Sequence, residues 1–354
     1  MKLAPFCFLL GLLAFSCDNS DVPTAYGPVA AFSASDSTIE TLDTIQFHNL
    51  SSNVNLNESE AFTWYFEGGT PAISHAISPQ VVYTNPGQFS VKLIVNRSGL
   101  CDSIQKDLFI KVQQSINDGL IGYYPFNGNA NDESGYNNNG VVYGALLSSN
   151  RFGQANRAYA FDGLSSFIEI VPDTLTLNDF TVSVWARCTG WKNQYPMDAQ
   201  YIFDGHAAER NVETNFTRPG MFIAYTRSND SINAISGCGY SMTNDQDIYF
   251  PMQWYASNST YLNDWVHLVI MRSGNDTKMY VNNQLITRAR GHQKNLPFVF
   301  DHPLYIGTFA GNNVYYYYYK STLNFSFKGL IDDLRIYNRA LSAQEINRLM
   351  RLTY

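Results

Sequence analysis

Charged side chains are scarce in this sequence. Lys, Arg, Asp and Glu together make up 15% of the 354 residues, and the excess of acidic over basic residues gives a net charge of −7. Runs of basic residues are missing as well. Proteins that bind nucleic acid or anionic lipid surfaces through charge depend on such runs. The composition therefore argues against both kinds of partner.

The common motifs of hydrolytic active sites are also missing. The chain contains neither His-Glu-x-x-His nor Gly-x-Ser-x-Gly, and its 6 histidines are scattered without the spacing of metal ligands. His267 lies in the strand-like run DWVHLVI and is predicted to be a packed strand residue. These absences favour a protein without catalytic activity.

Long apolar runs are limited to the first 17 residues, MKLAPFCFLLGLLAFSC. Lys2 precedes an apolar run that is too short for a comfortable membrane span and is typical of a secretory signal over residues 1–16. The ending LAFSC resembles the lipobox of bacterial lipoproteins, which implies that Cys17 is acylated and becomes the mature N-terminus. The alternative is ordinary cleavage near Ser16.

The segment after Cys17, residues 17–27, is polar, acidic and interrupted by Pro and Gly, as expected of a tether. Its acidic start resembles the surface-export signal of lipoproteins from the Bacteroidetes group. The two resemblances together imply a lipid-anchored protein of the cell envelope, exposed on the outer membrane.

Cysteine is rare, with 5 residues in the chain. Removal of Cys7 with the signal and acylation of Cys17 would leave Cys101, Cys188 and Cys238. Three cysteines allow at most one intrachain disulfide. Cys188 and Cys238 fall in the same half of the chain, so they either pair with each other or remain two buried thiols.

Aromatic residues are abundant, at 15%, and they recur in alternating, β-branched runs such as QFSVKLIVN and FTVSVWARC. Clusters of Asn, Gly, Asp and Ser separate these runs, and helical periodicity is found only near the C-terminus. This pattern predicts an all-β protein. The length predicts two domains.

The first predicted domain covers residues 28–113. Its segments WYFEGGTP and YTNPGQFSVKLIVN resemble the Trp-x-Phe-Gly motif and the closing strand pair of the PKD domain, a small immunoglobulin-like sandwich of extracellular proteins. Alternation marks Trp64 and Tyr83 as core residues rather than as platforms for sugars. The resemblance implies a spacer or adhesive module.

The second predicted domain covers residues 117–354. Segments such as RAYAFDGLSSFIEIV, DWVHLVIMRSGNDTKMYVNNQLI and FKGLIDDLRIYNRALSAQEINRLM resemble the laminin-G-like branch of the concanavalin A-like lectin/glucanase superfamily. This resemblance implies a jelly-roll β-sandwich. Near its end, Ser342 and Glu345 have the spacing of a helix capping box, and Ile346, Leu349 and Met350 predict a helix that packs on the sandwich.

The predicted closing strand GLIDDLRIYN carries two adjacent carboxylates. Period two places Leu330, Asp332, Leu334 and Ile336 on one face, and Ile331, Asp333, Arg335 and Tyr337 on the other. A carboxylate among aliphatic side chains needs a partner, because an unpaired buried charge costs several kcal/mol.

The oxygen-rich loop NGNANDESGYNNNG could supply such a partner through a cation. Calcium binds six to eight oxygen atoms of carboxylates, amides and carbonyls. The family resemblance implies a structural calcium, with Asp132 and Asp332 as ligands and Asn127 or Asn129 contributing oxygens. The alternative is purely structural: Asp132 forms an Asx turn, Asp332 accepts backbone N–H groups, and Asp333 pairs with Arg335 or faces solvent.

Long irregular segments around residues 190–262 and 308–325 extend beyond the usual family pattern and are rich in aromatic residues. Aromatic faces and amide groups are the usual contacts for sugars, so these segments provide the candidate ligand-binding residues, which are Trp191, Trp254, Tyr255, Tyr315, Tyr317 and Tyr319. Alternatively, these rings cover the sandwich edge and pack against the inserted loops.

Three functions remain open from the sequence. The first is non-catalytic carbohydrate binding by a surface lipoprotein, and the second is adhesion to protein partners. The third is glycoside hydrolysis, which needs two carboxylates about 5 Å apart in a retaining enzyme. Glucanases of this fold supply them from a Glu-x-Asp-x-Glu strand, and no such strand occurs here: FIEIV offers Glu169 alone. Binding is therefore favoured over hydrolysis.

Overall fold

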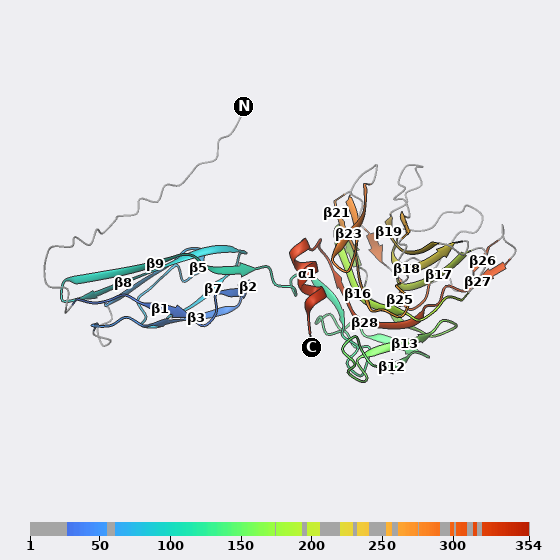
Figure 1. The fold of residues 1–354 in the computed structure, drawn as a ribbon, viewed down its shortest axis with the longest axis horizontal. Helices are drawn as coiled ribbons and strands as arrows, with labels where there is room; N and C mark the ends of the chain where they lie inside the picture. Colours follow the sequence, from blue (N-terminus) through green and yellow to red (C-terminus); the bar gives the residue numbers. More distant parts are fainter. Residues whose placement is uncertain are drawn as a thin grey trace, which may run out of the picture. The chain divides into compact units, whose positions relative to one another are not determined.

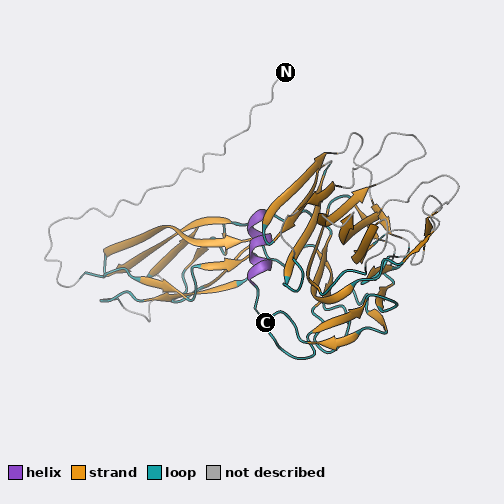
Figure 2. Ribbon diagram, turned by 45° about the vertical axis from the view of Figure 1, so that its right-hand side comes forward, coloured by secondary structure: helices purple, strands orange, loops and turns teal. Residues whose placement is uncertain are grey.

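The protein is described from a computed structural model. The described residues are 27–54, 61–173, 175–192, 197–205, 220–228, 232–240, 253–256, 261–274, 276–290, 298–300, 302–309, 314–316 and 321–353. Within them the chain consists mainly of strands, with one short helix (Figure 2). The chain divides into two compact units, Met1–Ser115 and Ile116–Tyr354. The predicted all-β class is confirmed.

The first unit contains two sheets in its described part (Figure 1). One has the strand order β1 (Phe32–Ala34), β3 (Thr44–Asn49), β7 (Gln80–Tyr83) and β5 (Gly69–Thr70). The other has the order β2 (Thr38–Glu40), β9 (Leu100–Gln113), β8 (Gly87–Arg97), β4 (Phe62–Phe66) and β6 (Ile73–Ser74).

Aromatic side chains from both sheets fill the core of this unit. Trp64 and Tyr83 are fully buried, as the alternation of their strands predicts. The rings of Trp64 and Phe66 stack with centroids 5.8 Å apart, and the Trp64 indole N–H donates to the carbonyl oxygen of Ala76 at 3.0 Å. The core prediction is confirmed, while assignment to the PKD family stays a prediction.

The second unit contains two large antiparallel sheets. The first, called here the β28 sheet, has the order β12 (Leu146–Ser148), β13 (Ala158–Asp162), β28 (Lys328–Tyr337), β16 (Phe180–Cys188), β21 (Val266–Ser273), β22 (Asp276–Val281) and β23 (Gln284–Arg290), and β10 (Leu120–Tyr124) also pairs with β28. The second, the β14 sheet, has the order β11 (Gly140–Tyr143), β14 (Phe167–Ile170), β25 (Leu304–Ile306), β17 (Met197–Asp204), β18 (Gly220–Ser228), β19 (Ile232–Tyr240) and β20 (Gln253–Ala256). Two short pairs accompany them, β15 (Leu175–Leu177) with β24 (Phe298–Phe300) and β26 (Val314–Tyr316) with β27 (Ser321–Leu323).

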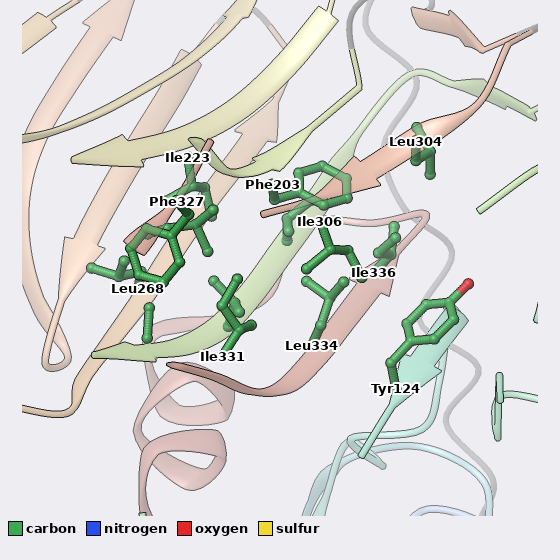
Figure 3. Packing of buried hydrophobic residues seen from close by; sticks show 14 of the residues in the cluster. Tyr124, Phe203, Ile223, Leu268, Leu304, Ile306, Phe327, Ile331, Leu334 and Ile336 are labelled. Atoms are coloured by element: carbon green, nitrogen blue, oxygen red, sulfur yellow. The ribbon is translucent and has the colours of Figure 1, made fainter. Parts of the chain in front are cut away.

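One apolar core lies between the two large sheets. Figure 3 shows Ile331, Leu334 and Ile336 of β28 on one side of it, and Phe203 and Ile306 of the β14 sheet on the other. Burying each such side chain contributes about 1.5–3 kcal/mol relative to leaving it exposed. The fold of this unit is therefore a two-layer β-sandwich in which each sheet has an inner and an outer face.

The helix α1 (Ala343–Arg351) lies against the outer face of the β28 sheet. Ser342 caps it: the Ser342 hydroxyl accepts from the Glu345 N–H at 3.3 Å, and the Glu345 carboxylate accepts from the Ser342 N–H at 2.8 Å. Ile346 and Leu349 are buried with Val269 of β21. The predicted capping box and apolar stripe are confirmed. Among the described residues, no helix is long and apolar enough to cross a membrane.

Candidate functional site

The adjacent carboxylates of β28 do not lie on opposite faces, so the period-two assignment of Asp332 is wrong. Asp333 has a positive φ of 49°, and the pairing of β28 with β16 shifts register between Ser183 and Trp185. This bulge places one extra residue in β28. Side chains after the bulge therefore point to the face opposite to the one that strict alternation from Asp332 predicts. Both carboxylates therefore point to the outer face, while Leu334 points into the core.

Arg151 binds both of these carboxylates. Its guanidinium nitrogens lie 2.6 Å from Asp332 Oδ2 and 3.2 Å from Asp333 Oδ2, and Arg335 Nε lies 3.0 Å from Asp333 Oδ1. Arg151 also donates to the carbonyl oxygen of Leu352 at 3.2 Å, which ties the segment after α1 to the sheet. These residues, named here the β28 ion cluster, neutralise each other's charge in a buried layer.

Burial shifts the pKa values of Asp332 and of the neighbouring His267. Burial raises the pKa of Asp332 to about 6, an effect that the Arg151 guanidinium opposes and the Asp333 carboxylate reinforces. Burial, together with the positive charges of Arg151 and Arg335, lowers the pKa of His267 to about 3. His267 is 1% exposed and its Nε2 lies 2.8 Å from the Ser183 hydroxyl. The prediction of a packed strand histidine is confirmed.

The predicted calcium ligands do not fit a cation in this arrangement. Asp132 Oδ1 accepts from the backbone N–H groups of Tyr123 and Ser134, each at 2.9 Å, and Oδ2 accepts from that of Asn138 at 3.0 Å. The Asp332 carboxylate faces the guanidinium of Arg151, which would repel a metal ion. No group of three or more His, Cys, Asp or Glu side chains in the described part of the chain could hold a metal.

The remaining residues of the calcium proposal also have structural partners or lie apart. Asn129 Oδ1 accepts from the N–H of Asn131 at 2.8 Å, and Asn127 is exposed. The bond from Ser134 to Asp132 forms the Asx turn of the structural alternative, and Asp333 pairs with Arg335 as that alternative states. Its third element is confirmed in part, because Asp332 accepts from the backbone N–H of Arg151 and, in addition, from the Arg151 guanidinium.

The cysteine prediction is resolved in part. Cys188 is a buried thiol rather than half of a disulfide, and its sulfur donates to the carbonyl oxygen of Gly190 at 3.6 Å. The pairing of Cys188 with Cys238 is therefore not formed; Cys238 lies in β19, in register with Phe222 of β18. Cys101, in β9, carries a disulfide bond. Cys17 lies outside the described residues.

The described aromatic residues among those proposed as ligand contacts lie on separate elements. Trp191 packs against the sandwich core, with its ring 6.4 Å from that of Tyr225. Trp254 and Tyr255 lie in β20, opposite Ser236 and Ile235 of β19, and Tyr315 lies in β26, opposite Thr322 of β27. Tyr317 and Tyr319 fall outside the described residues.

A different set of aromatic residues meets on the outer face of the β14 sheet. Residues directly opposite each other in antiparallel strands point to the same face. Tyr143 of β11 stands opposite Phe167 of β14, and Tyr305 of β25 stands opposite Glu169 of β14. Their neighbours Ile168 and Ile306 point the other way, into the core. We call Tyr143, Phe167, Glu169 and Tyr305 the Glu169 site.

Two phenols hold the carboxylate of the Glu169 site. Tyr305 donates to Glu169 Oε1 at 3.1 Å, and Tyr143 donates to Oε2 at 3.3 Å. Burial, with the Glu169 carboxylate and Asp204 nearby, raises the pKa of Tyr305 to about 12, so its hydroxyl stays protonated at neutral pH. The rings of Tyr143 and Phe167 stack with centroids 4.6 Å apart, and Phe167 lies 5.9 Å from Tyr305.

The Glu169 site is open toward the edge of the sheet. Tyr143 is 43% exposed and Val141, next to it on the edge strand β11, is 51% exposed. Phe167, Glu169 and Tyr305 are half-buried. Exposure ends at β17 and β18, where Asp204 and Phe222 are buried. The site is thus a partly desolvated surface of rings around one carboxylate.

The pattern FIEI carries the signal that could have revealed this site. Alternation alone places Phe167 and Glu169 together on the face opposite Ile168 and Ile170. The missing Glu-x-Asp-x-Glu pattern drew attention to Glu169 only as a candidate catalytic carboxylate. Its two phenol partners are 26 and 136 residues away in sequence, so their approach follows only from the strand order.

Several solved structures resemble this chain at low sequence identity. Among solved structures, domain 4 of an extracellular GH43 arabinanase from Geobacillus stearothermophilus, in complex with arabinotriose, has a TM-score of 0.44 and 18% identity over 66% of this chain and 98% of that one. The receptor-binding domain of botulinum neurotoxin D has a TM-score of 0.47 and 18% identity over 67% of this chain. The binding domain of botulinum neurotoxin DC, in complex with rat synaptotagmin II, has a TM-score of 0.46 and 16% identity, also over 67% of this chain. The chain spans about half of each toxin domain, 53% and 52%.

The family comparison concerns the second unit. No curated protein matches the chain. Residues 161–347 match the family model Laminin_G_3, described as the concanavalin A-like lectin/glucanases superfamily, and include most strands of both large sheets. Because this match covers more than half of the 354 residues, the chain belongs to the concanavalin A-like lectin/glucanase superfamily.

Proposed function

We propose that the second unit binds carbohydrate at the Glu169 site and that the protein is a non-catalytic binding protein. The observation that carries this proposal is a half-buried carboxylate held by two phenols and bordered by aromatic rings on an open sheet face. Membership of a lectin and glucanase superfamily is consistent with it.

The site matches the chemistry of a sugar. A carboxylate has about four lone-pair positions, and the two phenols occupy one on each oxygen of Glu169. The other positions can accept sugar hydroxyls, while the exposed ring of Tyr143 can contact sugar C–H groups. One such ring contact contributes about 1 kcal/mol, by analogy with aromatic pairs. A single site of this kind binds weakly.

Weak binding is useful when many copies act together on one surface. We therefore combine the site with the lipoprotein signal: Cys17 carries the lipid, residues 17–27 form a tether, and the PKD-like first unit is a spacer at the outer surface of the cell envelope. The segment LAFSC supports this part of the proposal. Labelled fatty acid should enter the wild-type protein and be lost in Cys17→Ala; equal labelling of both would contradict acylation.

A glycan array with the soluble chain starting at Asp18 tests carbohydrate binding. Tyr143→Ala should weaken binding of the best saccharide about fivefold, since it removes one ring and one phenol. Tyr136→Ala is the matched control, because Tyr136 is 58% exposed in the same unit and lies outside the site. Loss of binding in both variants, or in neither, would contradict the assignment to the Glu169 site. Release of shortened saccharides by the wild type would show an enzyme instead.

Adhesion to a protein partner is the second candidate function. The edge strands β11 and β12 carry exposed apolar side chains, among them Val141 at 51%, Leu146 at 71% and Leu147 at 37%. Exposed apolar edge strands favour association with another chain. Binding to whole cells that survives removal of surface glycans and is lost in Leu146→Asp would favour this candidate.

A further inference from the structure

Among the residues that the structure describes, no cation balances the carboxylate of Glu169. Its oxygens accept from the hydroxyl groups of Tyr143 and Tyr305, and within the described part of the chain neither Lys nor Arg pairs with it. The β28 ion cluster shows the opposite arrangement, in which Asp332 and Asp333 each contact a guanidinium. A partly desolvated carboxylate without a cation is a costly group for a fold to keep. The positive partner is therefore expected to come from outside the protein.

The surroundings of Glu169 also favour positive charge. The faces of Tyr143, Phe167 and Tyr305 carry the negative side of the ring quadrupole, which attracts ammonium groups. The carboxylate of Asp204 acts on the site as well, because it helps to raise the pKa of Tyr305. The whole chain has a net charge of −7, which adds a weaker attraction for cations at low salt. An acidic saccharide would meet repulsion from each of these groups.

From this geometry we propose that the Glu169 site selects saccharides that carry a free amino group, with the ammonium placed on the Glu169 carboxylate, and excludes acidic saccharides. The inference rests on the proposed carbohydrate-binding function and specifies its ligand class. An ammonium group offers three donors, and the carboxylate of Glu169 keeps lone pairs that the two phenols leave open. Acetylation of the amine removes the charge and two of the three donors.

Matched oligosaccharides test the inference on the soluble chain starting at Asp18. Glucosamine oligomers, their N-acetylated forms, glucose oligomers and galacturonate oligomers are compared by calorimetry at pH 6. We expect glucosamine oligomers to bind about tenfold more tightly than the N-acetylated and glucose oligomers, because hydrogen bonds to charged groups exceed those between neutral groups by about this factor. Galacturonate oligomers should show no binding. The preference for glucosamine should shrink as salt screens the charges.

Two variants test whether Glu169 causes the preference for glucosamine oligomers. Glu169→Gln should bind glucosamine and glucose oligomers equally, whereas Glu133→Gln, at an exposed carboxylate of the same unit, should keep the tenfold preference. If no saccharide binds the wild type, the proposed function fails. If glucose or galacturonate oligomers bind as tightly as glucosamine oligomers, the function stands and the inference is overturned. If Glu169→Gln does not fold, the inference is still tested by the wild type, through its relative affinities for the four oligosaccharides and the salt dependence of these affinities.

Discussion

The two outer faces of the second unit use carboxylates in different ways. On the β28 sheet, Asp332 and Asp333 are almost fully buried and contact the guanidinium groups of Arg151 and Arg335. On the β14 sheet, Glu169 is half-buried, and its hydrogen-bond partners in the described part of the chain are two neutral phenols. Buried carboxylates that pair with arginines stabilise the fold. A half-buried carboxylate that accepts from phenols remains available to a ligand. Substitutions at the two places should therefore change different quantities.

The largest effect is expected from Arg151→Met. The substitution leaves Asp332 and Asp333 buried with one guanidinium, and breaking a buried pair in this way costs about 3–5 kcal/mol. Hydrogen exchange at the amides of β16 and β28 measures the opening of this sandwich separately from the first unit. Arg351→Met, at an exposed arginine of α1, should change the opening free energy by less than about 0.5 kcal/mol. Equal protection in both variants would show that the β28 ion cluster contributes nothing.

A smaller effect should appear in the pH dependence of stability. The pKa of His267 is lowered to about 3 in the fold, against about 6.5 in the unfolded chain. The unfolded chain thus binds a proton that the folded protein does not, so His267 contributes stability above pH 6.5 that is lost as the pH falls toward 3. Relative to His267→Gln, the wild type should lose about 1.4 kcal/mol per pH unit between pH 6 and pH 4. Parallel stability curves for the two proteins would contradict the lowered pKa.

Substitution of the helix cap tests the outer face of the β28 sheet with a smaller expected change in stability. Ser342→Ala removes the oxygen that accepts from the Glu345 N–H and should reduce stability by about 1 kcal/mol. Binding of saccharide at the Glu169 site should not change, since α1 covers the other sheet. Ser342→Thr, which keeps the hydroxyl, serves as the control for thermal unfolding. A loss of saccharide binding in Ser342→Ala would contradict the independence of the two faces.

The smallest effect on stability should come from Glu169→Gln. The amide keeps an oxygen acceptor for one phenol and offers a donor to the other, and no cation loses its partner among the described residues. The melting temperature should therefore remain close to that of the wild type, with a change in stability below about 0.5 kcal/mol. A destabilisation comparable to that of Arg151→Met would place Glu169 with the structural carboxylates and remove the contrast between the faces.

Much of the fold could be predicted from local patterns. Alternation in FTWYF and FIEI assigns Trp64 and Ile168 to cores, and the spacing of Ser342 and Glu345 predicts α1, because these signals lie within a few neighbouring residues. The side of Asp332 could not be predicted, because one extra residue at the Asp333 bulge reverses every later assignment in a period-two pattern.

The partners of the charged residues could not be predicted for a different reason. Arg151 is 181 residues from Asp332, and Tyr305 is 136 residues from Glu169. Such contacts follow from the order of strands in a sheet, which local periodicity does not determine. The calcium hypothesis has the same cause. The buried carboxylate needed a partner, and an oxygen-rich loop can be recognised in the sequence, whereas the pairing with Arg151 cannot.

The position of β28 has a consequence for the folding of the second unit during synthesis. This strand lies in the middle of its sheet, between β13 and β16, yet among the described strands it leaves the ribosome last. The pairings of β28 with β10, β13 and β16 cannot form until residues 328–337 have been synthesised. Closure of this sandwich therefore depends on a strand that is synthesised after the other described strands of both large sheets.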